Sequence, residues 1–134
     1  MPCVLFLDDD HTRHWQFRTR VEELGYGKRY RMLYVFRAAE AIAALNDHAG
    51  EIVQAFLDHD LSEDDILIEV GAPSKVPTGM TVVDHILTMA RPPEAVIVHS
   101  YNQVAAVEMC ARLTALGTVA VQRIPFAQLL VLLA

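Results

Sequence analysis

Short apolar runs that are not interrupted by polar residues constrain the fold of this chain more than any other feature. Residues 4–7 read Val-Leu-Phe-Leu, residues 55–57 read Ala-Phe-Leu, and residues 95–98 read Ala-Val-Ile-Val. Runs of this length indicate strands, and strands that are apolar on both faces are typical of a parallel sheet with helices on each side. We therefore expect an α/β fold with three layers.

Strands and helices are expected to alternate along the whole chain. Strands are predicted at residues 4–7, 30–36, 53–57, 95–98 and 119–121. Helices are predicted at residues 12–24, 38–48 and 78–89, from a cap at Ser100 or Asn102 to Leu116, and at residues 126–133. Such alternation implies right-handed crossovers within a single domain over residues 1–134.

A long insertion is expected at about residues 61–78, which contain Gly71, Pro73 and Pro77. Residues 66–70 within it form a candidate short strand or flap, and loops this long are usually functional or mobile. The final helix, residues 126–133, is apolar nearly all round. It either packs into a groove or forms a homodimer interface, and packing is slightly favoured.

Composition limits the classes of partner. Of 134 residues, 53% are hydrophobic and 21% are charged, which is typical of a compact globular protein. The net charge of −6 argues against general binding to nucleic acid or to an anionic membrane. The sequence shows neither a signal peptide nor an apolar run of the ~20 residues that span a bilayer, so a cytoplasmic protein is expected. Cys3 and Cys110 form no CxxC pair and are expected to be buried apolar residues.

Acidic residues follow two of the predicted strands at the point where each strand ends. Asp8 and Asp9 follow residues 4–7, and Asp58 follows residues 53–57. The carboxyl ends of parallel strands meet at one edge of the sheet, which is where ligands bind in open α/β folds. Three carboxylates at this edge repel one another unless a cation neutralises them, and Mg²⁺ or Mn²⁺ suits oxygen ligands. The alternative for Asp8 or Asp9 is that it caps the following helix.

These residues resemble the response-regulator receiver domain from residue 4 to about residue 130. Matching positions are the acidic pair Asp8 and Asp9, the phospho-acceptor Asp58, Gly79 after it, the hydroxyl residue Ser100, and residues 123–126 (Arg-Ile-Pro-Phe) in place of the Lys-Pro-Phe signature. The resemblance implies a flavodoxin-like three-layer sandwich with a parallel sheet of order 2-1-3-4-5. Ile124 replaces the family's lysine, the insertion lengthens the loop after Asp58, and His11, His59 and His99 are expected at the mouth of the site.

The departures resemble a narrower branch, the cyclic-phosphate-processing receiver domains of bacterial and phage conflict systems. The resemblance rests on residues 57–61 (Leu-Asp-His-Asp-Leu), on Asp8 and Asp9 with Arg13 downstream, and on residues 99–102 (His-Ser-Tyr-Asn). It implies a pocket that recognises or hydrolyses a cyclic nucleotide or another small cyclic phosphate.

The chemistry assigns a role to each of these side chains. A metal on Asp8, Asp9 and Asp58 would polarise a phosphoryl oxygen. The candidate catalytic residues are Asp58, His59 and His99, with one histidine as general acid or base. Arg13, Ser100 and Asn102 are candidate ligand-binding residues, with Arg13 as a bidentate phosphate clamp.

Structural roles stay open for the same residues. His59 can bind the long loop, His99 can be a satisfied buried histidine, and Arg13 can balance local charge. Two other functions also stay open. One is a divergent receiver that is phosphorylated on Asp58, and the other is a non-catalytic adaptor that binds partners through the final helix or residues 61–78.

Overall fold

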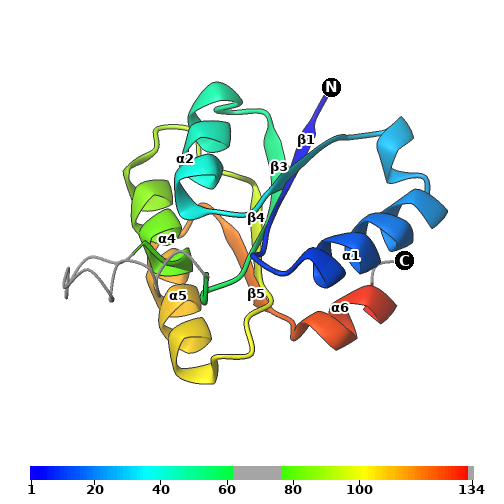
Figure 1. Ribbon diagram of the computed structural model, residues 1–134. Coiled ribbons are helices and arrows are strands. Elements are labelled where there is room, and N and C mark those ends of the chain that lie inside the picture. Colours follow the sequence, from blue (N-terminus) through cyan, green and yellow to red (C-terminus); the bar gives the residue numbers. More distant parts are fainter. Residues whose placement is uncertain (62–76, 133–134) are drawn as a thin grey trace.

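Five parallel strands form one sheet in the computed structural model, which describes residues 1–61 and 77–132 (Figure 1). They are β1 (Cys3–Leu7), β2 (Arg31–Val35), β3 (Ile52–Leu57), β4 (Ala95–Val98) and β5 (Ala120–Arg123). The order across the sheet is β2-β1-β3-β4-β5, and every neighbouring pair is parallel. The receiver-like topology that the resemblance implied is therefore confirmed.

Helices cover both faces of this sheet. They are α1 (His11–Glu23), α2 (Ala38–Asp47), α4 (Gly79–Thr88), α5 (Gln103–Leu116) and α6 (Phe126–Leu132), with a short 3-10 helix η1 (Tyr26–Lys28) after α1. Figure 1 shows α1 and α6 on one face and α2, α4 and α5 on the other. No helix in the described ranges is both long and apolar enough to cross a membrane.

The side chains of β1 explain why the core has two clusters, one on each face of the sheet. Leu5 and Leu7 lie in the larger core cluster under α2, α4 and α5, whereas Val4 and Phe6 lie in the smaller cluster under α1 and α6. Successive side chains of a strand point to opposite faces, so a strand buried on both faces must be apolar at every position. All five residues of β1 are buried.

Helix α6 packs against the smaller core cluster through Phe126 and Leu129, whereas Val131 stays exposed. The packing that was favoured for this helix is thus confirmed for its described residues, and its use in a homodimer stays a prediction. Residues 62–76, with the candidate strand at 66–70, lie outside the described residues.

Strand register places the candidate residues at one edge. Leu7 is paired with Leu57, and Leu57 with Val98. The next residues along these three neighbouring strands are Asp8, Asp58 and His99. Their backbone amides continue the ladder, since Asp58 N–H donates to the Leu7 carbonyl and His99 N–H donates to the Leu57 carbonyl. The sheet alone therefore brings these side chains together.

Candidate functional site

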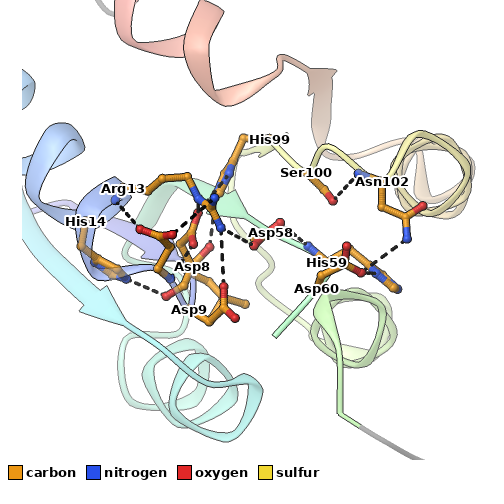
Figure 2. Close-up of polar contacts among 12 residues, drawn as sticks. Asp8, Asp9, Arg13, His14, Asp58, His59, Asp60, His99, Ser100 and Asn102 are labelled. Atoms are coloured by element: carbon orange, nitrogen blue, oxygen red, sulfur yellow. Dashed lines mark hydrogen bonds and ion pairs between the residues drawn. The ribbon is translucent and has the colours of Figure 1, made fainter. Parts of the chain in front are cut away.

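Three carboxylates meet at the carboxyl edge of β1 and β3, as the sequence predicted. Asp8 and Asp58 are buried and Asp9 is half-buried, and one oxygen of each lies within 4.8 Å of the others (Figure 2). We call Asp8, Asp9 and Asp58 the acid cluster. Burial of several carboxylates in one place costs free energy unless a cation or hydrogen bonds compensate the charge.

Arg13, in the first turn of α1, supplies part of that compensation. Its Nε donates to Asp8 Oδ2 at 2.7 Å, and its terminal nitrogens lie 3.5 Å from Asp9 and 3.6 Å from Asp58. Asp10 caps α1 by accepting from the Arg13 backbone N–H, which fixes the helix start and therefore the place of this side chain. The bond to Asp8 holds the pKa of Arg13 above its usual value. The residue predicted as a phosphate clamp thus already pairs with the carboxylates.

The site disfavours the ionised form of Asp58. Burial, followed by the charge of Asp8, raises the pKa of Asp58 to about 7, although Arg13 opposes the shift. Oδ1 of Asp58 accepts a hydrogen bond from the His59 N–H at 2.9 Å. A further cation near Oδ2 would favour the ionised form.

The donor set fits a divalent cation. Carboxylate oxygens are the ligands that Mg²⁺ and Mn²⁺ prefer in proteins. With all three groups ionised, the acid cluster carries a charge of −3 and Arg13 contributes +1, so these four side chains together carry a formal charge of −2. Asp8, Asp9 and Asp58 are therefore the residues that would hold such an ion, and Arg13 would have to share their oxygens with it.

His99 follows β4 and lies beneath the acid cluster rather than at an open mouth. It is 1% exposed, stacks on Phe6 at 5.1 Å between ring centroids, and its Nε2 lies 3.2 Å from the Leu7 carbonyl. A carbonyl only accepts, so Nε2 carries the proton, and Nδ1 lies 3.7 Å from Asp8 Oδ2. Burial lowers the pKa of His99 to about 4, which keeps the ring neutral. The expectation that His99 lines the mouth is wrong, because the aromatic core under α1 and α6 covers it.

His59 belongs to a second group of side chains beside Asp58. Its Nδ1 lies 2.6 Å from Asp60 Oδ1, and the same oxygen accepts from Asn102 Nδ2 at 3.4 Å (Figure 2). The carboxylate of Asp60 orients the imidazole and leaves Nε2 as the nitrogen that can serve a ligand. A histidine held by a carboxylate is a common arrangement for proton transfer.

Ser100 and Asn102 lie in the turn between β4 and α5 and already serve local structure. Asn102 Oδ1 accepts from Ala105 N–H and so caps α5, and Ser100 Oγ accepts from the Asn102 N–H at 3.1 Å. Ser100 Oγ keeps its own proton for donation. Asn102 also contacts Asp60, and it stays a candidate for ligand binding there. Ser100 is buried, with 1% of the residue exposed, and stays a candidate only for a ligand that reaches into the site.

Gly79 is required at the start of α4 by a close backbone approach. A Cβ at this position would overlap the carbonyl oxygen of Asp58 and the Cα of His59. Its N–H donates to the His59 carbonyl at 3.0 Å, and Thr78 closes a capping box at the same end of the helix. The glycine that the receiver resemblance singled out therefore holds α4 against the Asp58 segment.

The sequence did not single out His14 for a role in the site, and the structure packs its ring beside Asp8. It lies one turn into α1, its Nε2 lies 2.7 Å from the Asp8 carbonyl, and its ring stacks on Phe36 at 3.9 Å. His11 is exposed and lies against the same Phe36 at 4.6 Å. A signal for these contacts is present in the sequence: His11, His14, Trp15 and Arg18 recur at helical spacing, and Tyr34 and Phe36 lie in and after β2.

Comparison with known proteins identifies the relatives of this arrangement. A family model of the cyclic-phosphate processing receiver domain matches residues 3–115. A solved structure of the bacteriophytochrome response regulator AtBRR superposes with a TM-score of 0.59, over 96% of this chain and 87% of that chain, at 16% identity. At that identity, the likeness concerns the fold. No curated protein matches the sequence significantly.

Proposed function

The chain belongs to the cyclic-phosphate processing receiver domains, and on that premise we propose that it binds a cyclic phosphate at the acid cluster and hydrolyses it with a divalent ion. The observation that carries the proposal is the gathering of Asp8, Asp9 and Asp58 within 4.8 Å, with a single guanidinium among them. One divalent cation would neutralise the formal charge of −2 on these four side chains, and its remaining coordination positions would be open to a phosphoryl oxygen.

The residues divide the work of binding. Mg²⁺ or Mn²⁺ bound to the acid cluster supplies positive charge that polarises a phosphoryl oxygen. The Arg13 side chain is 27% exposed, so its guanidinium can hold a phosphoryl oxygen while it keeps the bond to Asp8. Ser100 lies on the other side of Asp58 from Arg13 (Figure 2), and its Oγ–H is the further candidate donor.

Proton transfer falls to the histidine that solvent can reach. In hydrolysis, the water oxygen bonds to phosphorus, a ring P–O bond breaks, and the leaving oxygen takes up a proton. His59, oriented by Asp60, is the group suited to give that proton and to regain one from water. His99 is buried and neutral, so we assign it a positioning role under Asp8.

A second candidate function is phosphorylation of Asp58 in a divergent receiver. The position of Asp58 at the tip of β3, with Ser100 at the tip of β4, favours it. Ile124 counts against it, because this side chain packs in the smaller core cluster at the place where receivers carry a lysine. A non-catalytic adaptor stays as the third candidate.

Turnover and labelling separate these functions. We expect the protein with Mg²⁺ to hydrolyse at least one member of a panel of 2′,3′- and 3′,5′-cyclic nucleotides. Asp58→Asn should lose that activity, and Asp84→Asn should keep it, because Asp84 is exposed on α4 and pairs with Arg112. A stable Asp58 adduct from acetyl phosphate without turnover would instead support the receiver. Neither activity, and no ligand binding, would leave the adaptor.

A further inference from the structure

A second cavity lies beside the acid cluster, and the phosphate chemistry does not use it. It has a volume of about 210 Å³ and lies between α1 and the end of β2. Its lining is almost wholly made of rings: His11, His14, Trp15, Arg18, Tyr34 and Phe36. We call this cavity the ring pocket. Its volume lies below the roughly 300–1,000 Å³ of pockets that enclose whole drug-sized ligands, so it suits a single planar ring system.

The walls of the ring pocket are arranged for stacking. Phe36 lies 3.9 Å from His14 and 4.6 Å from His11 between ring centroids. The guanidinium of Arg18 lies over the ring of Tyr34 at 4.2 Å. Trp15 is 67% exposed, although an indole is a large apolar surface to leave in water. Aromatic faces and arginine planes are the surfaces on which bases stack.

His14 contributes a buried ring to the wall of this pocket. The side chain is buried, with 7% of the residue exposed, and its Nε2–H donates to the Asp8 carbonyl. Nδ1 is then an acceptor; the Val35 carbonyl lies near the ring, but Nδ1 makes no hydrogen bond of normal geometry in the described part of the chain. Nδ1 is itself covered by the protein, so His14 serves the ring pocket as an aromatic face that stacks on Phe36.

The ring pocket and the acid cluster communicate along the surface. An adjoining hollow of about 330 Å³ shares His11 and Phe36 with the ring pocket and is lined as well by Asp9, Arg37 and Glu40. A ligand can therefore reach from Asp9 to the aromatic walls. The polar residues of this hollow lie between the proposed phosphate site and the aromatic walls, which is where the sugar of a nucleotide would lie.

We propose that the ring pocket holds the nucleobase of the ligand whose cyclic phosphate lies at the acid cluster, which makes that ligand a cyclic nucleotide. The inference rests on the proposed function for the phosphate end. For the base end it rests on the ring lining of the pocket, the exposed Trp15 and the hollow that joins the pocket to Asp9. A cyclic phosphate without a base would leave the ring pocket unused and would bind less tightly.

The fluorescence of Trp15 tests the base end directly in the unaltered protein. Trp15 is the single tryptophan of the chain and lines the ring pocket. Adenosine, which lacks a phosphate, should change this fluorescence in a saturable way, and 2′,3′-cyclic AMP should do so at lower concentration. Glycerol 1,2-cyclic phosphate, which lacks a base, should leave the fluorescence unchanged.

Calorimetric titration of a variant completes the test. Phe36→Leu should weaken the binding of 2′,3′-cyclic AMP by roughly 5- to 150-fold, the range found when one stacking partner of a base is removed. The affinity for glycerol 1,2-cyclic phosphate should not change. Phe36→Tyr keeps the ring and serves as the matched control, and circular dichroism checks that each variant is folded.

The outcomes separate this inference from the proposed function. Saturable adenosine binding without any cyclic-phosphate turnover would uphold the ring pocket and overturn the hydrolysis. Binding of glycerol 1,2-cyclic phosphate with no response of Trp15 to adenosine would uphold the phosphate site and overturn the ring pocket. Equal weakening of both ligands by Phe36→Leu would also overturn it.

Discussion

Replacement of Asp58 by asparagine is expected to stabilise the protein at alkaline pH in the absence of metal. The pKa of Asp58 is raised from 3.8 to about 7, so ionisation of this group opposes folding. A pKa difference of one corresponds to about 1.36 kcal/mol, which gives a cost of about 4 kcal/mol once the group is fully ionised. Asparagine carries no charge and keeps an oxygen that can accept the hydrogen bond from His59 N–H.

The full amount will not be recovered. The amide that replaces the carboxylate would bring a donor towards the Arg13 nitrogen that now lies 3.6 Å from Asp58 Oδ2, and this contact would be lost. We therefore expect Asp58→Asn to raise the free energy of unfolding by about 2–4 kcal/mol at about pH 8. Urea unfolding followed by circular dichroism measures this quantity, and Asp84→Asn on exposed α4 is the matched control with a change near zero.

The pH dependence distinguishes this explanation from a general effect of the substitution. Between the unfolded pKa of 3.8 and the folded pKa of about 7, the native state binds more protons at Asp58 than the unfolded state does. The contribution of Asp58 to stability therefore falls as pH rises through this window. The gain from Asp58→Asn should shrink towards zero as pH falls towards 4. Mg²⁺ should stabilise the wild type and have much less effect on the variant.

His99 is expected to make stability rise with pH, which is the opposite of the effect of Asp58. The Asp58→Asn variant should reveal this pH dependence. The folded pKa of His99 is about 4, against 6.5 in the unfolded chain, so the unfolded state binds more protons in between. Stability from this group rises with pH through that window, by about 3 kcal/mol. In the wild type, the opposite pH dependences of stability from Asp58 and His99 largely cancel. Asp58→Asn should instead lose stability on acidification from pH 6.5 to 4. A variant that is less stable than wild type at pH 8, or a gain that does not depend on pH, would refute the reasoning.

Three further substitutions test other parts of the site. Arg13→Gln should lower the free energy of unfolding at neutral pH by about 2–4 kcal/mol, because the buried Asp8 loses its partner at 2.7 Å. Mg²⁺ should then stabilise this variant more than it stabilises the wild type, as measured by thermal unfolding with and without Mg²⁺. Equal Mg²⁺ effects on the two proteins would contradict the idea that Arg13 and the ion share carboxylate oxygens. Gly79→Ala should destabilise the protein by about 1–3 kcal/mol in urea unfolding, because the added Cβ meets the Asp58 backbone. An unchanged unfolding midpoint would show that α4 can shift at no cost. Asn102→Ala should lower the free energy of unfolding by about 1 kcal/mol, because α5 loses its cap. Asn102→Asp keeps the cap and is the control. An equal loss of stability in both variants would assign the effect to the contact with Asp60 instead.

The acid cluster was predictable from the sequence because it depends only on strand periodicity and parallel register. Leu7 and Leu57 end adjacent strands in register, so the residues that follow them must meet. The surroundings of the cluster depend on tertiary packing, which no local pattern encodes. The exposure of His99 is an example: its position after β4 was clear from the sequence, but its burial comes from Phe6 and Phe126 packing around its ring.

Arg13 shows the same limit more sharply. The sequence placed it one turn into a helix near Asp8 and Asp9, which is compatible with both a phosphate clamp and local charge balance. Which carboxylates it meets depends on where α1 begins, and the Asp10 cap sets that start. The ring pocket was equally hidden, because its walls come from one face of α1 and the end of β2 and acquire a function only when the two elements lie side by side.

The position of the cation links these observations. The receiver resemblance implies a lysine at the end of β5, where this chain has Ile124. Here Ile124 packs in the core, and the guanidinium that meets the acid cluster comes from α1, the helix that also lines the ring pocket. His14, one residue after Arg13, binds the Asp8 carbonyl and Phe36 at once. A ligand that bridges Arg13 and the ring pocket would thus contact α1 with both of its ends. Phosphate binding and base recognition should therefore be coupled, so Phe36→Leu should reduce turnover of a cyclic nucleotide while leaving that of a base-free cyclic phosphate unchanged.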